Sequence, residues 1–221
     1  SLWRLDEASG QRTDVISGEN LSPYNAPVAG SGMRSHATLF DRALSQGLRR
    51  ELADVDALGF NGAGQSLTVA LWFRVDSNTH DYRFLIGFGN NETYASSWSL
   101  AIGYQNSLSA QVFTHQWDQL YVSTGSIAPG QWHHVVMTYE AGANRMRLFL
   151  DGTLAGDMTG YSGPGNGGIM APQSAFGIGC CDGMNWETYQ PAPTGFFHGL
   201  IDEAAVWRAA PADPTLFAAS L

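Results

Sequence analysis

The stretch QWHHVVMTYEAGANRMRLFLDG, Gln131 to Gly152, predicts the fold most directly. Side chains from Trp132 to Tyr139 alternate between two faces, which is the period of a β-strand, and the run Arg145 to Leu150 alternates again after a short loop. Asp151-Gly152 then supplies the two positive-φ positions that a tight type I′ turn requires. The stretch therefore predicts consecutive antiparallel strands of a larger sheet.

The composition favours one mostly β domain. A chain of 221 residues is usual for a single sandwich or barrel, and no linker-like segment divides it. With 26 Gly, 9 Pro, 12% aromatic and only 14% charged residues, the sequence favours many short strands and turn-rich loops over helices. We therefore expect residues 1–221 to form a single domain.

The charge pattern excludes several classes of partner. The net charge is -9, and all eleven basic residues are Arg, so no Lys can serve a phosphate loop or a Schiff base. An acidic surface repels phosphates, which argues against a nucleic acid partner. No stretch is apolar over the length needed to cross a bilayer, so we expect no membrane insertion. We expect an extracellular or cell-surface protein whose signal lies outside this sequence.

The two cysteines, Cys180 and Cys181, are adjacent and so cannot build a framework of cross-chain disulfides within the monomer. A vicinal disulfide, free thiols and inert buried thiols all stay open. A buried thiol or a loop staple is favoured over a catalytic role.

Further alternating runs predict the other strands, and Gly- and Pro-rich segments predict loops. The predicted strands are 65–75, 84–88, 98–104, 108–113, 120–124, 174–179 and 199–207, after a short N-terminal strand. The predicted loops or surface connections are 22–32, 156–172 and 182–195, and residues 211–221 suggest a terminal helical turn.

The segment 43–60 is ambiguous, because its leucines and Val55 fall near helical spacing. Asp54-Val55-Asp56 resembles the start of an EF-hand calcium loop. Leu58 and Gln65, however, occupy positions where that loop needs an oxygen ligand and a bidentate Glu, so an EF-hand is excluded.

Several motifs in order along the chain resemble the laminin G-like domain family of the concanavalin A-like lectin/glucanase superfamily. They are Trp3 to Glu7 with Asp14 and Gly18, Ser66 to Phe73, Trp132 to Val135 with Tyr139, Leu150 to Gly152, and Phe197 to Trp207. Each motif is weak alone, and together they are specific. The resemblance implies an all-β, two-sheet antiparallel jelly-roll sandwich with one concave and one convex sheet and at most short helical turns. It also implies a strand near 48–53 in place of a helix.

The resemblance further implies a structural calcium ion, since relatives often hold Ca²⁺ on the convex side. Asp202, on the last predicted strand, matches the family's position, and Asp6, Glu7 and Asp14 are the candidate N-terminal ligands. Backbone carbonyls would complete the six to eight oxygens that calcium takes. The alternative is that Asp202 pairs with an Arg or accepts hydrogen bonds from loop amides.

Aromatic residues beside polar ones suggest a carbohydrate surface, because aromatic rings stack on sugars while amides and acids bond the hydroxyls. The candidate rings are Trp98, Tyr104, Trp117, Tyr121, Trp186 and Tyr189, and Asp118 is a candidate polar contact. For any single ring, the alternative is that it covers the core.

Enzyme motifs are absent from the sequence. The Glu-x-Asp-x-(x)-Glu strand of the superfamily's glucanases and the Gln-x-His triplet of its lyase-like members do not occur. His133 and His134 point to opposite faces of one strand, so they cannot chelate together. We expect a non-catalytic binding module, part of a larger multidomain protein, that recognises glycan or a cell-surface protein. A hydrolase or lyase with an unrecognised site and an architectural, adhesive module stay open as alternatives.

Overall fold

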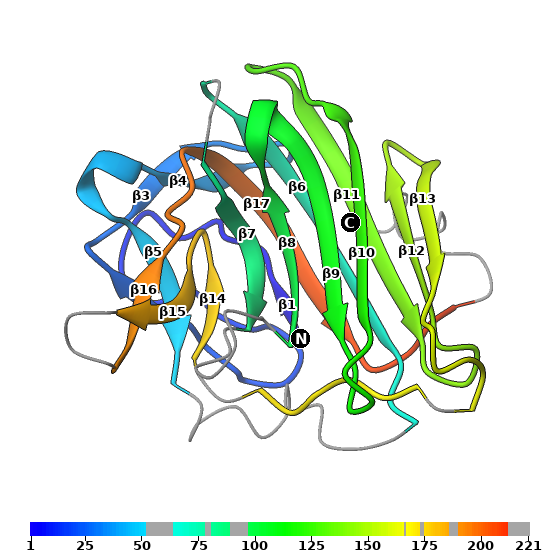
Figure 1. Cartoon of the computed structure of the whole chain (residues 1–221). Helices are drawn as coiled ribbons and strands as arrows, with labels where there is room; N and C mark the ends of the chain where they lie inside the picture. The colour runs from blue at the N-terminus through cyan, green and yellow to red at the C-terminus, as the bar shows by residue number, and fades with distance from the viewer. Residues whose placement is uncertain are drawn as a thin grey trace.

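The computed structural model describes residues 1–51, 64–77, 81–88, 97–165, 167–172, 175–185 and 190–211. Two antiparallel sheets lie one behind the other and form a sandwich, as Figure 1 shows. The described residues contain no α-helix, only the short 3₁₀ turns η1 (Arg42–Leu44) and η3 (Tyr104–Asn106). The predicted all-β jelly-roll sandwich is therefore confirmed. No helix of the described part is long and apolar enough to span a membrane.

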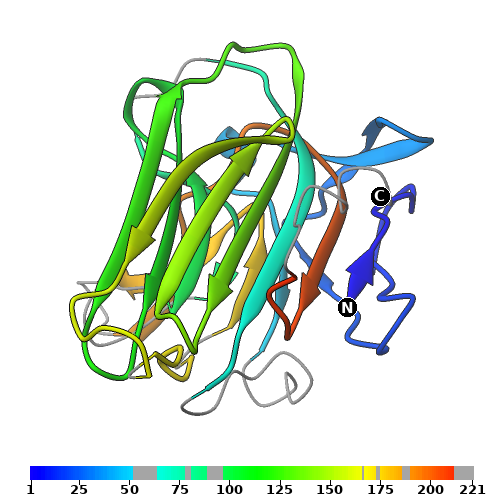
Figure 2. The same cartoon turned by 90° about the vertical axis from the view of Figure 1, so that its right-hand side faces the viewer.

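One sheet has eight described strands. Its order is β13 (Thr153–Thr159), β12 (Arg145–Leu150), β11 (Trp132–Glu140), β6 (Leu67–Val75), β17 (Gly199–Trp207), β4 (His36–Phe40) and β3 (Val28–Ser31), and β1 (Leu2–Trp3) also pairs with β17. Figure 2 shows β1, the first strand of the chain, beside β17, the last strand. The two ends of the described chain are therefore joined through one sheet.

The second sheet has seven described strands and carries a separate hairpin. Its order is β10 (Gln119–Ser126), β9 (Ser107–Phe113), β8 (Trp98–Ile102), β7 (Arg83–Phe88), β14 (Phe176–Ile178), β5 (Gly47–Arg50) and β2 (Ser22–Tyr24). The hairpin, β15 (Cys181–Asn185) with β16 (Gln190–Thr194), lies against β14 and β7.

The core lies between the two sheets and follows from the alternation of the strands. On β6, every second residue from Leu67 to Val75 is fully buried in one hydrophobic cluster with the inward residues of the other sheet. Trp3, near the N-terminus, stacks on Phe176 with ring centroids 5.2 Å apart. One hydrophobic cluster therefore joins strands from both ends of the described chain, and a smaller cluster of Ala70, Val136, Phe149 and Ala205 lies apart from it.

The predicted hairpin is confirmed. β11 pairs antiparallel with β12 from Val135 opposite Leu150 to Glu140 opposite Arg145. Asp151 and Gly152 have φ of 50° and 76°, as the tight turn requires. The Asp151 carboxylate also accepts a hydrogen bond from the His134 amide and lies 2.8 Å from Nδ1 of His133. The Asp151 side chain therefore ties the turn between β12 and β13 back to β11.

Three predicted loops contain strands, so those loop predictions are wrong in part. The segment 22–32 contains β2 and β3, the segment 156–172 begins inside β13, and the segment 182–195 forms most of the β15–β16 hairpin. The prolines and glycines that suggested loops are tolerated because these strands lie at sheet edges, where one side needs no ladder bonds. Gly156 also packs where a Cβ would lie 1.9 Å from Val122 Cγ1, so close strand packing accounts for that glycine.

The segment with helical spacing, 43–60, begins in the turn η1 and continues into the strand β5, Gly47–Arg50, near the strand that the family resemblance implied. Residues 52–63 and 212–221, which include the rest of this segment and most of the predicted terminal turn, lie outside the described residues. Cys180 and Cys181 are free thiols and both are buried. Burial raises the pKa of Cys180 to about 12 and raises that of Cys181 as well, which fits inert core thiols.

Candidate functional site

The outer face of β9 and β10 presents a row of polar side chains with exposed aromatic rings. Alternate residues of the two strands point into the core: Leu108, Ala110, Val112, Leu120 and Val122. The residues between them lie on the outer face, and we call Ser109, Gln111, Gln119, Tyr121 and Ser123 the β9–β10 strip, of which Ser109 is only 2% exposed. In the register, Gln111 lies directly opposite Tyr121, and Ser109 lies opposite Ser123. The packed core beneath therefore fixes the spacing of the strip.

A second tyrosine, Tyr82, joins the strip from the segment before β7. Its hydroxyl lies 2.7 Å from Oγ of Ser109 and donates to the Tyr121 hydroxyl at 3.1 Å. Burial raises the pKa of Tyr82 well above its ordinary value, and the neighbouring Tyr121 adds to the rise. The Tyr82 hydroxyl is therefore protonated at neutral pH. Tyr82 and Tyr121 still expose 43% and 41% of their surface, so parts of both rings face solvent.

Two predicted ligand residues lie at opposite ends of the β9–β10 ribbon. Tyr104, in the turn before β9, is 61% exposed, and Trp117, in the turn between β9 and β10, is 70% exposed. Trp117 adopts φ of 63°, and its amide donates to the carbonyl of Thr114 at 2.9 Å. The strip between them thus has an exposed ring near each end.

Asp118 was predicted to contact ligand, but its side chain is buried and bonded within the protein. Its Oδ2 accepts hydrogen bonds from Asn144 Nδ2 at 2.8 Å and from the Ser162 amide at 3.0 Å, and the Ser162 hydroxyl also donates to it. Burial favours a raised pKa for Asp118, but these donors outweigh it and lower the pKa. Asp118 therefore ties the Trp117 turn to the loop at Ser162.

Asn144 is the centre of this buried network. Besides Asp118, its amide donates to Ser162 Oγ at 3.0 Å, and its Oδ1 accepts from the Tyr139 hydroxyl at 3.0 Å. The amide of Gly168 in turn donates to the Tyr139 hydroxyl at 2.9 Å. The network joins three loops at the end of the sandwich where Trp117 is exposed.

Trp98 is a core residue, which corrects its prediction as a ligand contact. It is fully buried and packs edge-on to Phe88, with ring centroids 5.6 Å apart. Leu100 and Ile102 follow it on the same inward face of β8. Trp186 and Tyr189, the other predicted rings, lie outside the described residues.

Two of the predicted N-terminal calcium ligands hold backbone amides. Asp14 accepts from the amides of Leu2, Ile16, Ser17 and Glu19 and from the Ser17 hydroxyl. Although burial opposes it, this set of donors lowers the pKa of Asp14 far below its ordinary value. Glu7 accepts from the Thr13 amide at 2.7 Å. Both side chains therefore organise the N-terminal loop, residues 4–21 between β1 and β2.

Asp202 and Asp6 also accept hydrogen bonds from loop amides. Oδ2 of Asp202 accepts from Met33 at 2.8 Å, and Oδ1 of Asp6 accepts from His36 at 2.9 Å. Burial raises the pKa of Asp202, and the nearby charge of Asp6 adds to the rise. Among the described residues, no three Asp, Glu, His or Cys side chains gather as a metal-binding group. Those residues alone therefore supply no complete calcium shell, and the calcium ion stays a prediction.

Comparisons with known proteins agree with this architecture. The family model described as the concanavalin A-like lectin/glucanases superfamily matches residues 52–214. Domain 4 of AbnA, a GH43 extracellular arabinanase from Geobacillus stearothermophilus solved with arabinotriose, is 13% identical with a TM-score of 0.60, covering 97% of this chain and 100% of that one.

Two other solved structures share the fold at low identity. The CBM40 of the Ruminococcus gnavus IT-sialidase, bound to α2,3 sialyllactose, is 15% identical with a TM-score of 0.56 over 79% of this chain and 93% of that chain. A Trypanosoma rangeli sialidase is 17% identical with a TM-score of 0.65, and the match covers 97% of this chain but only 31% of the sialidase. No curated protein matches the sequence.

Proposed function

The chain belongs to the concanavalin A-like lectin/glucanases superfamily, and from that premise we propose that it is a non-catalytic extracellular module that binds an oligosaccharide along the β9–β10 strip. The observation that carries the proposal is the pairing of the exposed Tyr121 ring with Gln111 directly across the ladder. A ring supplies an apolar face for a sugar, and an amide beside it supplies both a donor and an acceptor for hydroxyl groups.

The dimensions of the strip suit a short oligosaccharide. Ser123 lies four positions after Gln119 along β10, which corresponds to about 14 Å at the usual rise of a strand. Hydroxyl and amide groups recur along this length, and the strip's five residues include no acidic or basic side chain. An uncharged surface of this kind suits neutral sugars, since no charge has to be desolvated on binding.

The structural relatives support the proposal through what they bind. The arabinanase domain was solved with arabinotriose and the CBM40 with sialyllactose. At 13% and 15% identity they share the fold with this chain, so the sugar that this protein binds has to be found by experiment.

A glycan array tests the function, and side-chain amide signals in ¹H–¹⁵N spectra locate the site. We expect a bound oligosaccharide to shift the side-chain amide signals of Gln111 and Gln119, which Gln→Ala variants assign. If no glycan binds, or if binding leaves both signals unchanged, the proposal is wrong. Release of new reducing ends from the bound glycan would support the hydrolase alternative instead.

The proposal includes a structural calcium ion at Asp202, which has a separate test. A ligand that binds only the folded protein stabilises it, by about 2.7 kcal/mol at a concentration 100 times its Kd. The thermal midpoint of the wild type should therefore fall when EGTA is added and recover when calcium is restored. An unchanged midpoint would contradict a tightly coupled calcium ion.

A further inference from the structure

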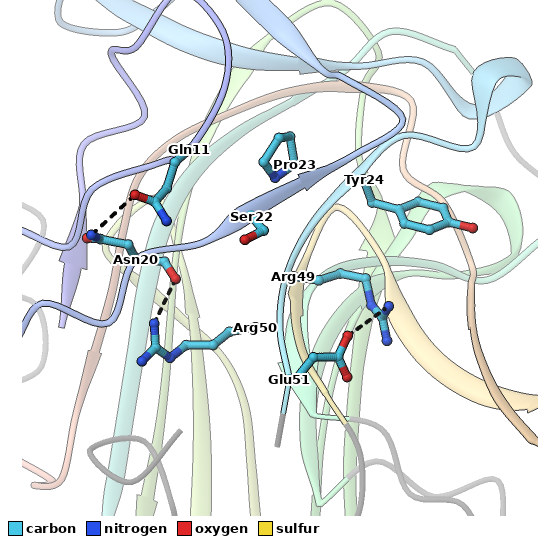
Figure 3. A pocket seen from close by; sticks show the side chains of 8 residues that line it. All are labelled: Gln11, Asn20, Ser22, Pro23, Tyr24, Arg49, Arg50 and Glu51. Carbon is cyan, nitrogen blue, oxygen red and sulfur yellow. Dashed lines mark hydrogen bonds and ion pairs between the residues drawn. The ribbon is translucent and has the colours of Figure 1, made fainter. Parts of the chain in front are cut away.

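At the opposite edge of the seven-stranded sheet, the N-terminal loop, β2 and β5 enclose a polar cavity of about 380 Å³ (Figure 3). Its lining consists of Gln11, Asn20, Ser22, Pro23, Tyr24, Arg49, Arg50 and Glu51. The volume lies within the range of small-molecule sites. We infer that this cavity is a second binding site, which takes a single uncharged sugar residue or a similar hydroxyl-rich molecule.

The two arginines of the cavity are held in place by carboxylates. Arg49 Nη2 lies 2.7 and 2.9 Å from the two carboxylate oxygens of Asp182, whose side chain is only 5% exposed. Arg50 Nε lies 2.6 Å from Glu19, and its Nη1 donates to the Asn20 carbonyl at 2.9 Å. Guanidinium groups that are anchored this way lose little further freedom when a ligand binds.

The aromatic ring in the cavity wall is also fixed. The Tyr24 ring stacks on Phe196 at 6.0 Å with nearly parallel planes, and the Arg49 guanidinium lies 5.9 Å from the Tyr24 ring centre. The Tyr24 ring is thus packed against two side chains of the protein. The polar lining of the cavity offers a ligand mainly hydrogen bonds, in contrast to the stacking that we propose for the β9–β10 strip.

The charges around the cavity favour an uncharged ligand. Each guanidinium is already paired, Arg49 with Asp182 and Glu51 and Arg50 with Glu19, although only Glu51 of these carboxylates lines the cavity. An anionic ligand would have to compete with these carboxylates for the two guanidinium groups. A hydroxyl group, in contrast, can donate to the exposed Glu51 carboxylate or accept from an anchored guanidinium, and both are charge-assisted hydrogen bonds.

The cavity is a separate site from the strip. Strands β10 and β2 are the two edges of the seven-stranded sheet, six strand spacings apart, which corresponds to about 29 Å. The inference therefore does not rest on the proposed function of the strip, and one site can be tested while the other fails.

Side-chain amide signals in ¹H–¹⁵N spectra report on the two sites separately, because Gln11 and Asn20 line the cavity while Gln111 and Gln119 belong to the strip. The wild type would be titrated with glucose, galactose, arabinose and xylose, and with glucuronate and galacturonate as charged counterparts of the two hexoses. We expect at least one neutral sugar to shift the Gln11 and Asn20 side-chain signals saturably, and a uronate to bind at least tenfold more weakly. If no neutral sugar shifts these signals, or if a uronate binds as tightly, the inference is overturned.

Matched variants complete the test. Glu51→Ala removes an exposed acceptor without exposing core, and we expect it to weaken binding of the responding sugar about tenfold. Tyr121→Ala, on the strip, should leave binding in the cavity unchanged. Equal affinity of wild type and Glu51→Ala would also contradict the inference.

Discussion

Asn144 should carry a large share of the stability of the loops around Trp117. The residue is fully buried, and its side chain makes three hydrogen bonds, to Asp118, Ser162 and Tyr139. Replacing it with Ala leaves a buried carboxylate short of a donor and a buried hydroxyl without its acceptor. Such losses are more costly than the net value of an average hydrogen bond.

The size of the effect follows from these contacts. The bond to the Asp118 carboxylate is worth about 2 kcal/mol, and the two neutral bonds are worth about 1 kcal/mol each. Asn144 also adopts φ of 48°, which Asn tolerates and which costs Ala about 1 kcal/mol more. We therefore expect Asn144→Ala to lower the free energy of unfolding by about 5 kcal/mol.

Urea unfolding, followed by far-UV circular dichroism, measures this loss. Asn144→Gly is the matched control, because it removes the same three bonds without the strain at positive φ, and it should lose about 1 kcal/mol less than the Ala variant. If both variants unfold within 1 kcal/mol of the wild type, the network does not hold these loops.

Three further predictions concern buried side chains. Burial lowers the pKa of His134 to about 4, so the unfolded chain binds a proton there that the folded protein does not, and stability should fall by up to about 3 kcal/mol from pH 6.5 to 4. The His134→Leu variant has no such group, so its free energy of unfolding in urea should fall less between pH 7 and pH 4.5 than that of the wild type. An equal fall in both proteins would refute the prediction. Cys180 and Cys181 should react with a thiol reagent only after denaturation, since both are buried; fast reaction of the native protein would contradict that burial. Trp98→Ala should cost about 4 kcal/mol in urea unfolding, and a cost below 1 kcal/mol would rule out its core position.

The strands could be predicted because alternation reports which residues share a face. Leu67 to Val75, the final strand 199–207 and the hairpin after Gln131 all appear as expected. The same alternation groups Trp98 with Leu100 and Ile102, so the core position of Trp98 was readable from its neighbours. An aromatic ring within such a run is a weaker sign of a ligand than a ring in a turn, such as Trp117.

Tyr121 was a candidate ring in the sequence, but the strip as a whole and the cavity could not be predicted, because both depend on register and on contacts between distant segments. Alternation places Gln111 and Tyr121 on outward faces, but only the pairing of β9 with β10 puts them opposite each other. Tyr82 reaches Ser109 from a segment 27 residues away. The β15–β16 hairpin escaped prediction because Pro191 and Pro193 suggest a loop, and the pairing with β15 alone allows them.

The acidic residues show a related limit. Asp14 and Asp202 stand where the family resemblance suggests calcium ligands, and each accepts several hydrogen bonds from backbone amides. A carboxylate that organises a loop and one that binds a cation look the same in sequence, since both need an oxygen acceptor beside a turn. The structure shows that Asp14 and Asp202 organise loops, and the chelator experiment tests whether a calcium ion also binds.

The most direct test of the central claim is the affinity of wild type and Tyr121→Ala for the oligosaccharide selected by the array, measured by isothermal titration calorimetry. Loss of the ring should weaken binding about tenfold, while Tyr121→Phe keeps the ring and most of the affinity. Ile16→Ala, which removes an exposed apolar side chain from the N-terminal loop, should bind as the wild type does. Equal affinity of wild type and Tyr121→Ala would contradict binding at the β9–β10 strip.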